Sequence, residues 1–107
     1  MAASYLKDAG YQILARNYRV ASGEIDLIVS KDGYLIFVEV KYRSNSRYGS
    51  PEAAVTPVKQ RQIRVALYYM KRYGYDPYNT PVRFDVVAVA ENEIHHMKDA
   101  FPYQGYY

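Results

Sequence analysis

The chain has 107 residues, a mass of 12.4 kDa and a 50% hydrophobic composition, which is enough for one packed domain and too little for a second core. Because it contains no cysteine, a disulfide framework, a thiolate zinc site and a cysteine nucleophile are all excluded. No apolar run approaches the length of a membrane span and no secretory leader is expected, so we expect a cytoplasmic location. A net charge of +3 permits an anionic partner but fits ordinary surface charge equally well.

The first part of the chain predicts a short helix followed by strands. Residues 2–9 place small and apolar side chains along one side of a helix that Gly10 would end. About two turns are marginal for a helix, so this segment resembles the end of a longer, truncated one. Three strands are expected after it, at residues 11–20, 24–30 and 34–42. The dipeptide Asp32-Gly33 between the last two is the strongest hairpin signal in the chain.

The second part predicts a loop, one long helix and two further strands. Residues 43–55 show no period and predict a mobile loop, and Thr56-Pro57 then marks a helix start. Apolar positions recur after it at helical spacing, namely Ile63, Ala66, Leu67 and Met70. The remaining expected segments are strands at residues 82–90 and near 94–98, and an irregular tail at 101–107. This order predicts one α/β domain over residues 1–107, with a mixed sheet and helices packed on it.

The predicted hairpin brings like charges together. A two-residue turn defines the register, which gives one apolar face where Ile25 opposes Val40. On the other face Asp26 opposes Glu39, and like charges directly opposed on neighbouring strands are destabilising. Four charged residues gather at this end of the hairpin: Glu24, Asp26, Glu39 and Lys41, with Lys41 opposite Glu24.

Two interpretations of this acidic pair remain open. A salt-bridge cluster neutralised by Lys41 would simply close a strand end, and residue types alone favour it. Alternatively, a divalent metal offsets the repulsion, because Mg²⁺ prefers a few carboxylate oxygens with a backbone carbonyl and water. The Lys41 ammonium, two residues after Glu39 on the same strand face, would then reach an attacking water or a developing phosphate charge.

The residues around this pair resemble a known pattern. Ile25-Asp26 followed by Glu39-Val40-Lys41 resembles the PD-(D/E)xK nuclease signature, with isoleucine in place of proline. The wider match covers almost the whole chain and resembles the YraN family of uncharacterised proteins, through the strings at residues 23–28, 37–43, 54–60 and 83–87. That family is similar in fold to archaeal Holliday-junction resolvases, so the resemblance implies a restriction-endonuclease-like mixed sheet flanked by helices.

The resemblance also implies an activity, that of a Mg²⁺- or Mn²⁺-dependent nuclease that hydrolyses phosphodiester bonds in branched or structured DNA. It makes Asp26 and Glu39 the metal ligands, with the carbonyl of Val40 as a third. Lys41 would orient the attacking water or stabilise phosphate charge, and Gln60 matches a polar position near the site. The family pattern has a further Gly-Glu pair, which would precede the first residue of this chain, so weak metal binding is expected.

Other polar residues are weighed against ordinary structural roles. Gln60 is expected to face inward, where bonding to the helix start is an equally good explanation. A basic track that would contact phosphate without reading bases comprises Arg43, Arg47, Arg61, Arg64, Lys71 and Arg72. For its helical part, a solvated helix face is the commoner explanation. His95 and His96 point to opposite strand faces and are interpreted as non-catalytic, and Asp85 as structural.

Two rival functions stay open beside the nuclease. One is a non-catalytic nucleic-acid-binding module that keeps the fold and the basic track. The other is a structural or partner-binding domain that uses a tyrosine-rich surface, since the chain has 14 tyrosines against three phenylalanines. DNA is the expected partner, no membrane contact is expected, and a homodimer is left open.

Overall fold

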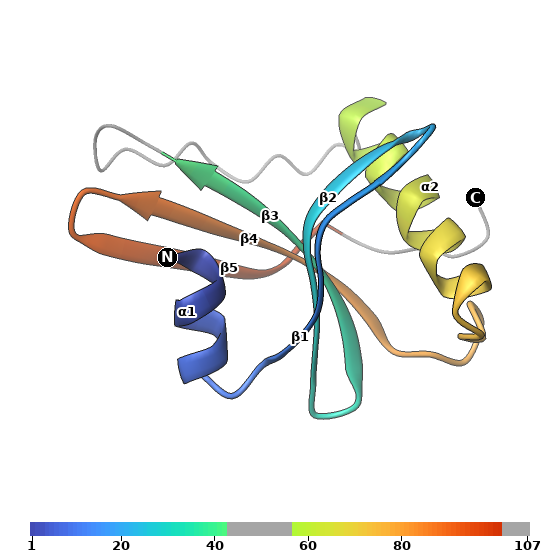
Figure 1. Cartoon of the computed structure of the whole chain (residues 1–107), viewed down its shortest axis with the longest axis horizontal. Coiled ribbons are helices and arrows are strands. Elements are labelled where there is room, and N and C mark those ends of the chain that lie inside the picture. Colours follow the sequence, from blue (N-terminus) through green and yellow to red (C-terminus); the bar gives the residue numbers. More distant parts are fainter. Residues whose placement is uncertain (43–56, 102–107) are drawn as a thin grey trace.

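The computed structural model describes residues 1–42 and 57–101, which form two helices and one five-stranded sheet (Figure 1). The helices are α1 (Ala2–Asp8) and α2 (Pro57–Arg72). The strands are β1 (Gln12–Val20), β2 (Gly23–Lys31), β3 (Tyr34–Tyr42), β4 (Val82–Ala90) and β5 (Glu93–Phe101). They lie in the order β1-β2-β3-β4-β5, with β3 and β4 parallel and the other neighbours antiparallel. The α/β mixed sheet predicted from the sequence is confirmed.

The short helix ends where the sequence indicates. Gly10 has a φ of +93°, and its N–H donates to the carbonyl of Lys7, while the N–H of Tyr11 donates to that of Leu6. This left-handed residue turns the chain from α1 directly into β1, which lies at one edge of the sheet. The helix is held by packing, because Ala2 and Leu6 are buried against the sheet.

The β2–β3 hairpin has the two-residue turn expected from its sequence. Asp32 and Gly33 have φ values of +53° and +84°, the backbone signature of a type I′ turn. The turn places Lys31 opposite Tyr34, and the predicted register continues without interruption to Leu27 opposite Val38.

Each face of the sheet is covered by one helix, and each face has its own core (Figure 1). On the α2 face, the core is built from aromatic and aliphatic side chains that include Ile28, Phe37, Ile63, Met70 and Phe84. On the α1 face, it is built from aliphatic side chains that include Leu6, Val29, Ile36 and Val87. The middle strands are therefore apolar on both sides, as expected for strands buried between two layers.

Helix α2 approaches β2 closely at Gly23. This glycine has a φ of +154°, and a Cβ there would lie 3.3 Å from Cγ2 of Val65 and 4.0 Å from Cβ of Arg61. A side chain at this position would strain the backbone and crowd the Val65 side chain. The contact fixes the first half of α2 over the beginning of β2, three residues before Asp26.

The last strand is longer than expected. β5 extends over Glu93–Phe101 rather than ending near residue 98, and Phe101 pairs with Phe84 instead of beginning an irregular tail. A register shift with Asp99 at a φ of +55° lets the strand bend and continue. The loop predicted at 43–55, the Thr56 helix start and the tail from residue 102 lie outside the described residues. Within residues 1–42 and 57–101, no helix is long and apolar enough to cross a bilayer.

Candidate functional site

The β2–β3 ladder ends one residue before the acidic pair. Its last paired residues are Leu27 and Val38, although both strands extend further. The predicted pairs beyond this point are wrong: Asp26 with Glu39, Ile25 with Val40 and Glu24 with Lys41. The two strands separate at the position where the sequence placed two facing carboxylates.

A kink in the first hairpin explains the separation. On β1, Asn17 has a φ of +49°, and the β1–β2 pairing skips this residue and Asp26. Residues two apart on a regular strand share a face, but Leu27 packs on the α1 side whereas Ile25 packs on the α2 side with Tyr18. The prediction that Ile25 shares the apolar face of Leu27 is therefore wrong, because β2 changes face at Asp26.

The kink directs the Asp26 carboxylate towards β3. Its Oδ2 accepts a hydrogen bond of 2.8 Å from the backbone N–H of Val40. In a continued ladder this N–H would have bonded to the backbone of β2. Since the N–H and C=O of one residue point to the same side of an antiparallel strand, the Val40 carbonyl also faces the opening beside Asp26. The Asp26 carboxylate thus takes the place of the missing backbone acceptor. It lies next to the main chain of Val40, the residue that follows Glu39.

Glu39 lies on the face that α2 covers. It is half-buried on the same side of β3 as Phe37, and it lines a space of about 10 Å³ together with Gln62 of α2. A space of this size holds about one water molecule, so helix and strand are closely packed around the carboxylate. The structure therefore places both acidic residues at the open end of the hairpin, with Asp26 in the plane of the sheet and Glu39 above it.

The polar helix residue at this site differs from the one predicted. Gln60 was expected to face inward, but it is exposed, and Gln62 contacts the space beside Glu39 instead. Side chains two residues apart on a helix are rotated by about 200° around its axis, so only one of Gln60 and Gln62 can face the sheet. Gln62 has Ala66 and Tyr69 at i+4 and i+7, both buried, but Gln60 has Ile63 and Leu67 at i+3 and i+7, so helical spacing alone did not distinguish the two.

The predicted four-residue charge cluster does not form. Glu24 pairs with Arg19 across β1 and β2 at 3.3 Å instead. Lys41 is exposed, and among residues 1–42 and 57–101 no ion pair joins it to Asp26 or Glu39. The geometry therefore does not favour the interpretation in which Lys41 neutralises the carboxylates as a closed salt-bridge cluster.

The donor set at the open end suits a hard divalent cation. Asp26, Glu39 and the carbonyl of Val40 offer only oxygen atoms, which Mg²⁺ prefers. The hydrogen bond from Val40 holds one Asp26 oxygen and leaves the other available. The part of the chain that the structure describes has no group of three or more His, Cys, Asp or Glu residues that would hold a metal. Two carboxylates and a carbonyl would leave most positions to water and substrate, as Mg²⁺ commonly does.

All charged side chains of helix α2 are positive. Its sequence contains five basic residues and no acidic one, so it lacks the alternating signs of an ordinary solvated helix face. The predicted basic residues on it are exposed, namely Arg61, Arg64, Lys71 and Arg72. Arg43 and Arg47 lie outside the described residues.

A buried polar network occupies the opposite face of the sheet, under α1. Asp85 is 1% exposed and accepts hydrogen bonds from Arg83 at 2.8 and 2.9 Å, from the backbone N–H of Asp99 at 2.9 Å, and contacts His96 Nε2 at 2.7 Å. Arg83 also donates to the Tyr11 hydroxyl at 3.1 Å.

This network sets the charge state of Asp85. Burial acts to raise the pKa of Asp85, but the hydrogen bonds from His96, Arg83 and Asp99 outweigh it and hold the pKa below its usual range. The polar atoms buried here have partners, as do all buried side-chain nitrogens and oxygens in the described residues. The structural interpretation of Asp85 and His96 fits this arrangement, which ties β4 and β5 to α1.

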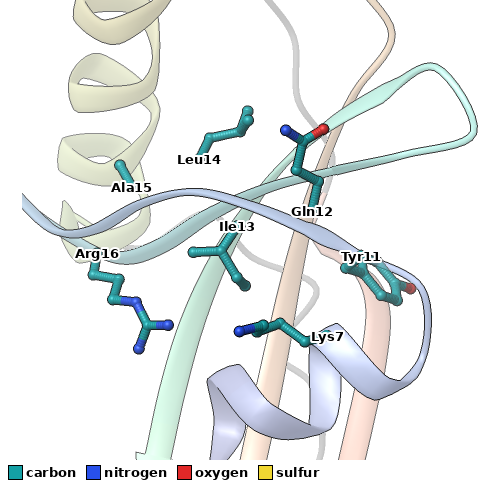
Figure 2. A pocket seen from close by; sticks show the side chains of 7 residues that line it. All are labelled: Lys7, Tyr11, Gln12, Ile13, Leu14, Ala15 and Arg16. Atoms are coloured by element: carbon teal, nitrogen blue, oxygen red, sulfur yellow. The ribbon is translucent and has the colours of Figure 1, made fainter.

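A separate hollow of about 720 Å³ lies between α1 and the edge strand β1 (Figure 2). Figure 2 shows the side chains that line it, from Lys7, Tyr11, Gln12, Ile13, Leu14, Ala15 and Arg16. None of the predicted site residues lines this hollow, so it is distinct from the open end of the hairpin.

Comparisons with known proteins place the chain among uncharacterised relatives. Residues 1–89 match the model of the uncharacterised protein family UPF0102. A UPF0102 protein of Lachnoclostridium phytofermentans is 51% identical over 104 residues, covering 97% of this chain and 88% of the relative. A second, from Syntrophus aciditrophicus, is 47% identical over 106 residues, covering 94% and 82%. A third, from Symbiobacterium thermophilum, is 54% identical over 89 residues, covering 82% and 74%.

Proposed function

We propose that this chain, which belongs to the uncharacterised protein family UPF0102 (YraN), is a metal-dependent nuclease that hydrolyses phosphodiester bonds in branched or structured DNA. One observation carries the proposal. The β2–β3 ladder opens at Asp26, whose carboxylate bonds to the N–H of Val40, the residue that follows Glu39. The hydrogen bond to Val40 accounts for Asp26 but not for a second half-buried carboxylate at Glu39, to which no cation is paired within the described residues.

Each residue at the open end has a defined role in this proposal. Asp26, Glu39 and the Val40 carbonyl hold one divalent cation, Mg²⁺ or Mn²⁺, which supplies Lewis-acid polarisation of the phosphate. Lys41 lies on the Glu39 side of β3 and is exposed, so its ammonium reaches the phosphate or the attacking water. The hydrogen bond from the Val40 N–H holds Oδ2 of Asp26 and would leave Oδ1 available to a cation.

The charge on α2 supports a nucleic-acid substrate. Arg61 lies over the beginning of β2, next to Gly23, so the basic face starts close to the acidic pair. Such a face binds phosphates independently of base sequence. Recognition of DNA shape rather than sequence is therefore the expected mode.

A second function is favoured by the same helix. The cationic face of α2 does not depend on the acidic pair, so a module that binds nucleic acid without cleaving it would keep this feature. Metal-dependent cleavage of DNA distinguishes the nuclease from the module that only binds nucleic acid.

The test is a cleavage screen over linear, flapped, forked and four-way DNA with Mg²⁺ or Mn²⁺. The wild-type protein should cut at least one branched substrate, and Asp26→Asn and Glu39→Gln should each lower the rate about a hundredfold or more. Glu91→Gln, an exposed carboxylate on the β4–β5 turn, is the matched control and should keep the wild-type rate. Binding to all substrates without metal-dependent cleavage would instead support the non-catalytic module.

A further inference from the structure

A cluster of tyrosine rings lies where β1 meets the second half of α2. We call it the aromatic patch, and it consists of Tyr18, Tyr68, Tyr69, Arg72 and Tyr73. Tyr68 and Tyr73 are 53% and 55% exposed. They stand beside the cations of α2 rather than in isolation, so the patch is both aromatic and positively charged.

The rings of the patch support one another. Tyr69 is buried, and its ring centroid is 4.7 Å from that of Tyr73 and 5.2 Å from that of Tyr18, with Tyr18 edge-on. Burial raises the pKa of the Tyr18 hydroxyl, and the nearby Tyr73 and Tyr68 hydroxyls raise it further. The buried ring of Tyr69 fixes the exposed ring of Tyr73, which reduces the entropy lost when a ligand stacks on it.

Cations surround the exposed rings. The Arg72 guanidinium lies 5.3 Å from the centroid of the Tyr73 ring. Arg64 and Lys71 are exposed on the same side of α2, because residues three and four apart from Tyr68 are its neighbours on the helix surface. In the described part of the chain, neither of these two residues is joined to a carboxylate by an ion pair.

The patch and the acidic pair share one face of the sheet. Tyr18 is the neighbour of Ile25 across β1 and β2, and Ile25 lines the same small space as Glu39. Moving across the α2 face from β3 to β1, one therefore meets Glu39, Ile25 and Tyr18 in turn. The patch and Glu39 therefore lie on the same side of the sheet, although buried Ile25 lies between Tyr18 and Glu39.

We propose that the aromatic patch binds a single-stranded segment of DNA, with bases stacked on Tyr68 and Tyr73 and phosphates held by Arg64, Lys71 and Arg72. The inference rests on the proposed nuclease function and narrows its substrate to branched DNA with an unpaired arm. Two features select this ligand. Exposed aromatic rings stack on bases only where the bases are unpaired, because a duplex hides the faces of its bases. Adjacent cations without carboxylates match a chain of phosphates.

The test measures binding without cleavage. A labelled 15-nucleotide oligo(dT) and a 15-base-pair duplex are titrated with the protein in EDTA, and fluorescence anisotropy gives both affinities. Tyr68→Ala/Tyr73→Ala should weaken oligo(dT) binding about tenfold or more, the loss expected from one or two stacked bases, and change duplex binding less than about twofold. Tyr68→Phe/Tyr73→Phe keeps the rings and should bind oligo(dT) like the wild type.

Two further variants guard against a general loss of structure. Tyr68→Ala alone leaves the Tyr69–Tyr73 packing intact and should still weaken oligo(dT) binding selectively. Tyr78→Ala removes an 81% exposed ring outside the patch and should have no effect. Equal losses for oligo(dT) and duplex, or equal behaviour of the Phe and Ala variants, would overturn the inference.

Taken together with the cleavage screen, the binding experiment separates this inference from the proposed function. Selective oligo(dT) binding without any metal-dependent cleavage would overturn the nuclease proposal and support the patch. Metal-dependent cleavage with oligo(dT) binding that does not depend on the tyrosine rings would overturn the patch alone.

Discussion

At the scale of single residues, Asp26 has a structural task that can be separated from any metal. Its carboxylate satisfies the Val40 N–H, which the end of the ladder leaves without a backbone partner. We expect Asp26→Ala to lower the free energy of unfolding by about 1–2 kcal/mol in metal-free buffer, because an N–H in a half-buried position loses its acceptor. Asp26→Asn keeps an oxygen there and should lie within about 0.5 kcal/mol of the wild type. Urea unfolding measures both, and an equal loss in the two variants would show that charge rather than the hydrogen bond is required.

Asp85 makes the stability of the protein depend on pH. Its pKa is depressed in the folded state, so its contribution is complete above the unfolded pKa of about 3.9 and is lost as the pH falls through the lower folded value. Asp85→Asn should lower the free energy of unfolding at pH 7 by about 3 kcal/mol, because it leaves Arg83 without its buried partner. The variant should also lose less stability than the wild type between pH 5 and pH 2, when urea midpoints are compared over that range. Asp32→Asn, at an exposed turn, is the control and should follow the wild-type pH dependence.

Some of these residue roles were predictable and others were not. The turn sequence brought Asp26 and Glu39 to the same end of the hairpin, but the direct opposition predicted for them was wrong, because β2 changes face at Asp26. The Arg83–Asp85 pairing was also visible in principle, because residues two apart on a strand share a face. The choice between Gln60 and Gln62 was not, because Gln60 borders the same apolar stripe at Ile63 and only the docking of α2 on the sheet decides which one turns inward.

At the scale of elements, the turn sequence determined the hairpin register near the turn but not far from it. The register held from Lys31 opposite Tyr34 to Leu27 opposite Val38, because a type I′ turn leaves little choice there. Beyond that point the kink depends on Asn17, a residue of a different strand with a positive φ. The sequence of the β2–β3 hairpin alone therefore does not predict a kink that depends on the neighbouring strand β1.

The basic face of α2 gives a prediction about salt. Replacing Arg64 and Lys71 with alanine should weaken DNA binding similarly for all sequences, because these side chains contact phosphate only. It should also flatten the plot of log affinity against log salt by about one unit of slope for each lost contact. Lys7→Ala on α1, which covers the opposite face of the sheet, is the matched control. Unchanged affinity and slope in the double variant would show that these basic residues form a solvated helix face and do not contact DNA.

At the scale of the whole molecule, the sheet separates two tasks. Its α1 face holds the Asp85 network. In this network the Tyr5 hydroxyl of α1 hydrogen-bonds to His96 of β5 and so joins the helix to the sheet. Its α2 face holds Glu39, the basic residues and the aromatic patch. Composition and element order predicted a mixed sheet with helices, but the assignment of α1 and α2 to opposite faces is a property of packing that local periodicity does not contain.

This division leads to a prediction about metal and global stability. A cation held by Asp26 and Glu39 binds the folded state only, so Mg²⁺ or Mn²⁺ should raise the melting temperature as its concentration rises. Two carboxylates and a carbonyl make a weak site, with millimolar affinity expected from ligand number and charge. At 100 times the dissociation constant the gain would be about 2.7 kcal/mol, and each 1 kcal/mol corresponds to about 4–8 °C for a domain near this size.

The variants decide which residues are responsible for that shift. Asp26→Asn should abolish it while leaving the metal-free melting temperature nearly unchanged, because the Val40 N–H keeps an acceptor. Glu91→Gln should shift like the wild type, because its carboxylate lies on the exposed β4–β5 turn. A shift that persists in Asp26→Asn would place the cation elsewhere. If calorimetry detects no metal binding to the wild type, the nuclease proposal is wrong. The hydrogen bond from Val40 to Asp26 would then be the remaining role of the carboxylates at the open end of the hairpin.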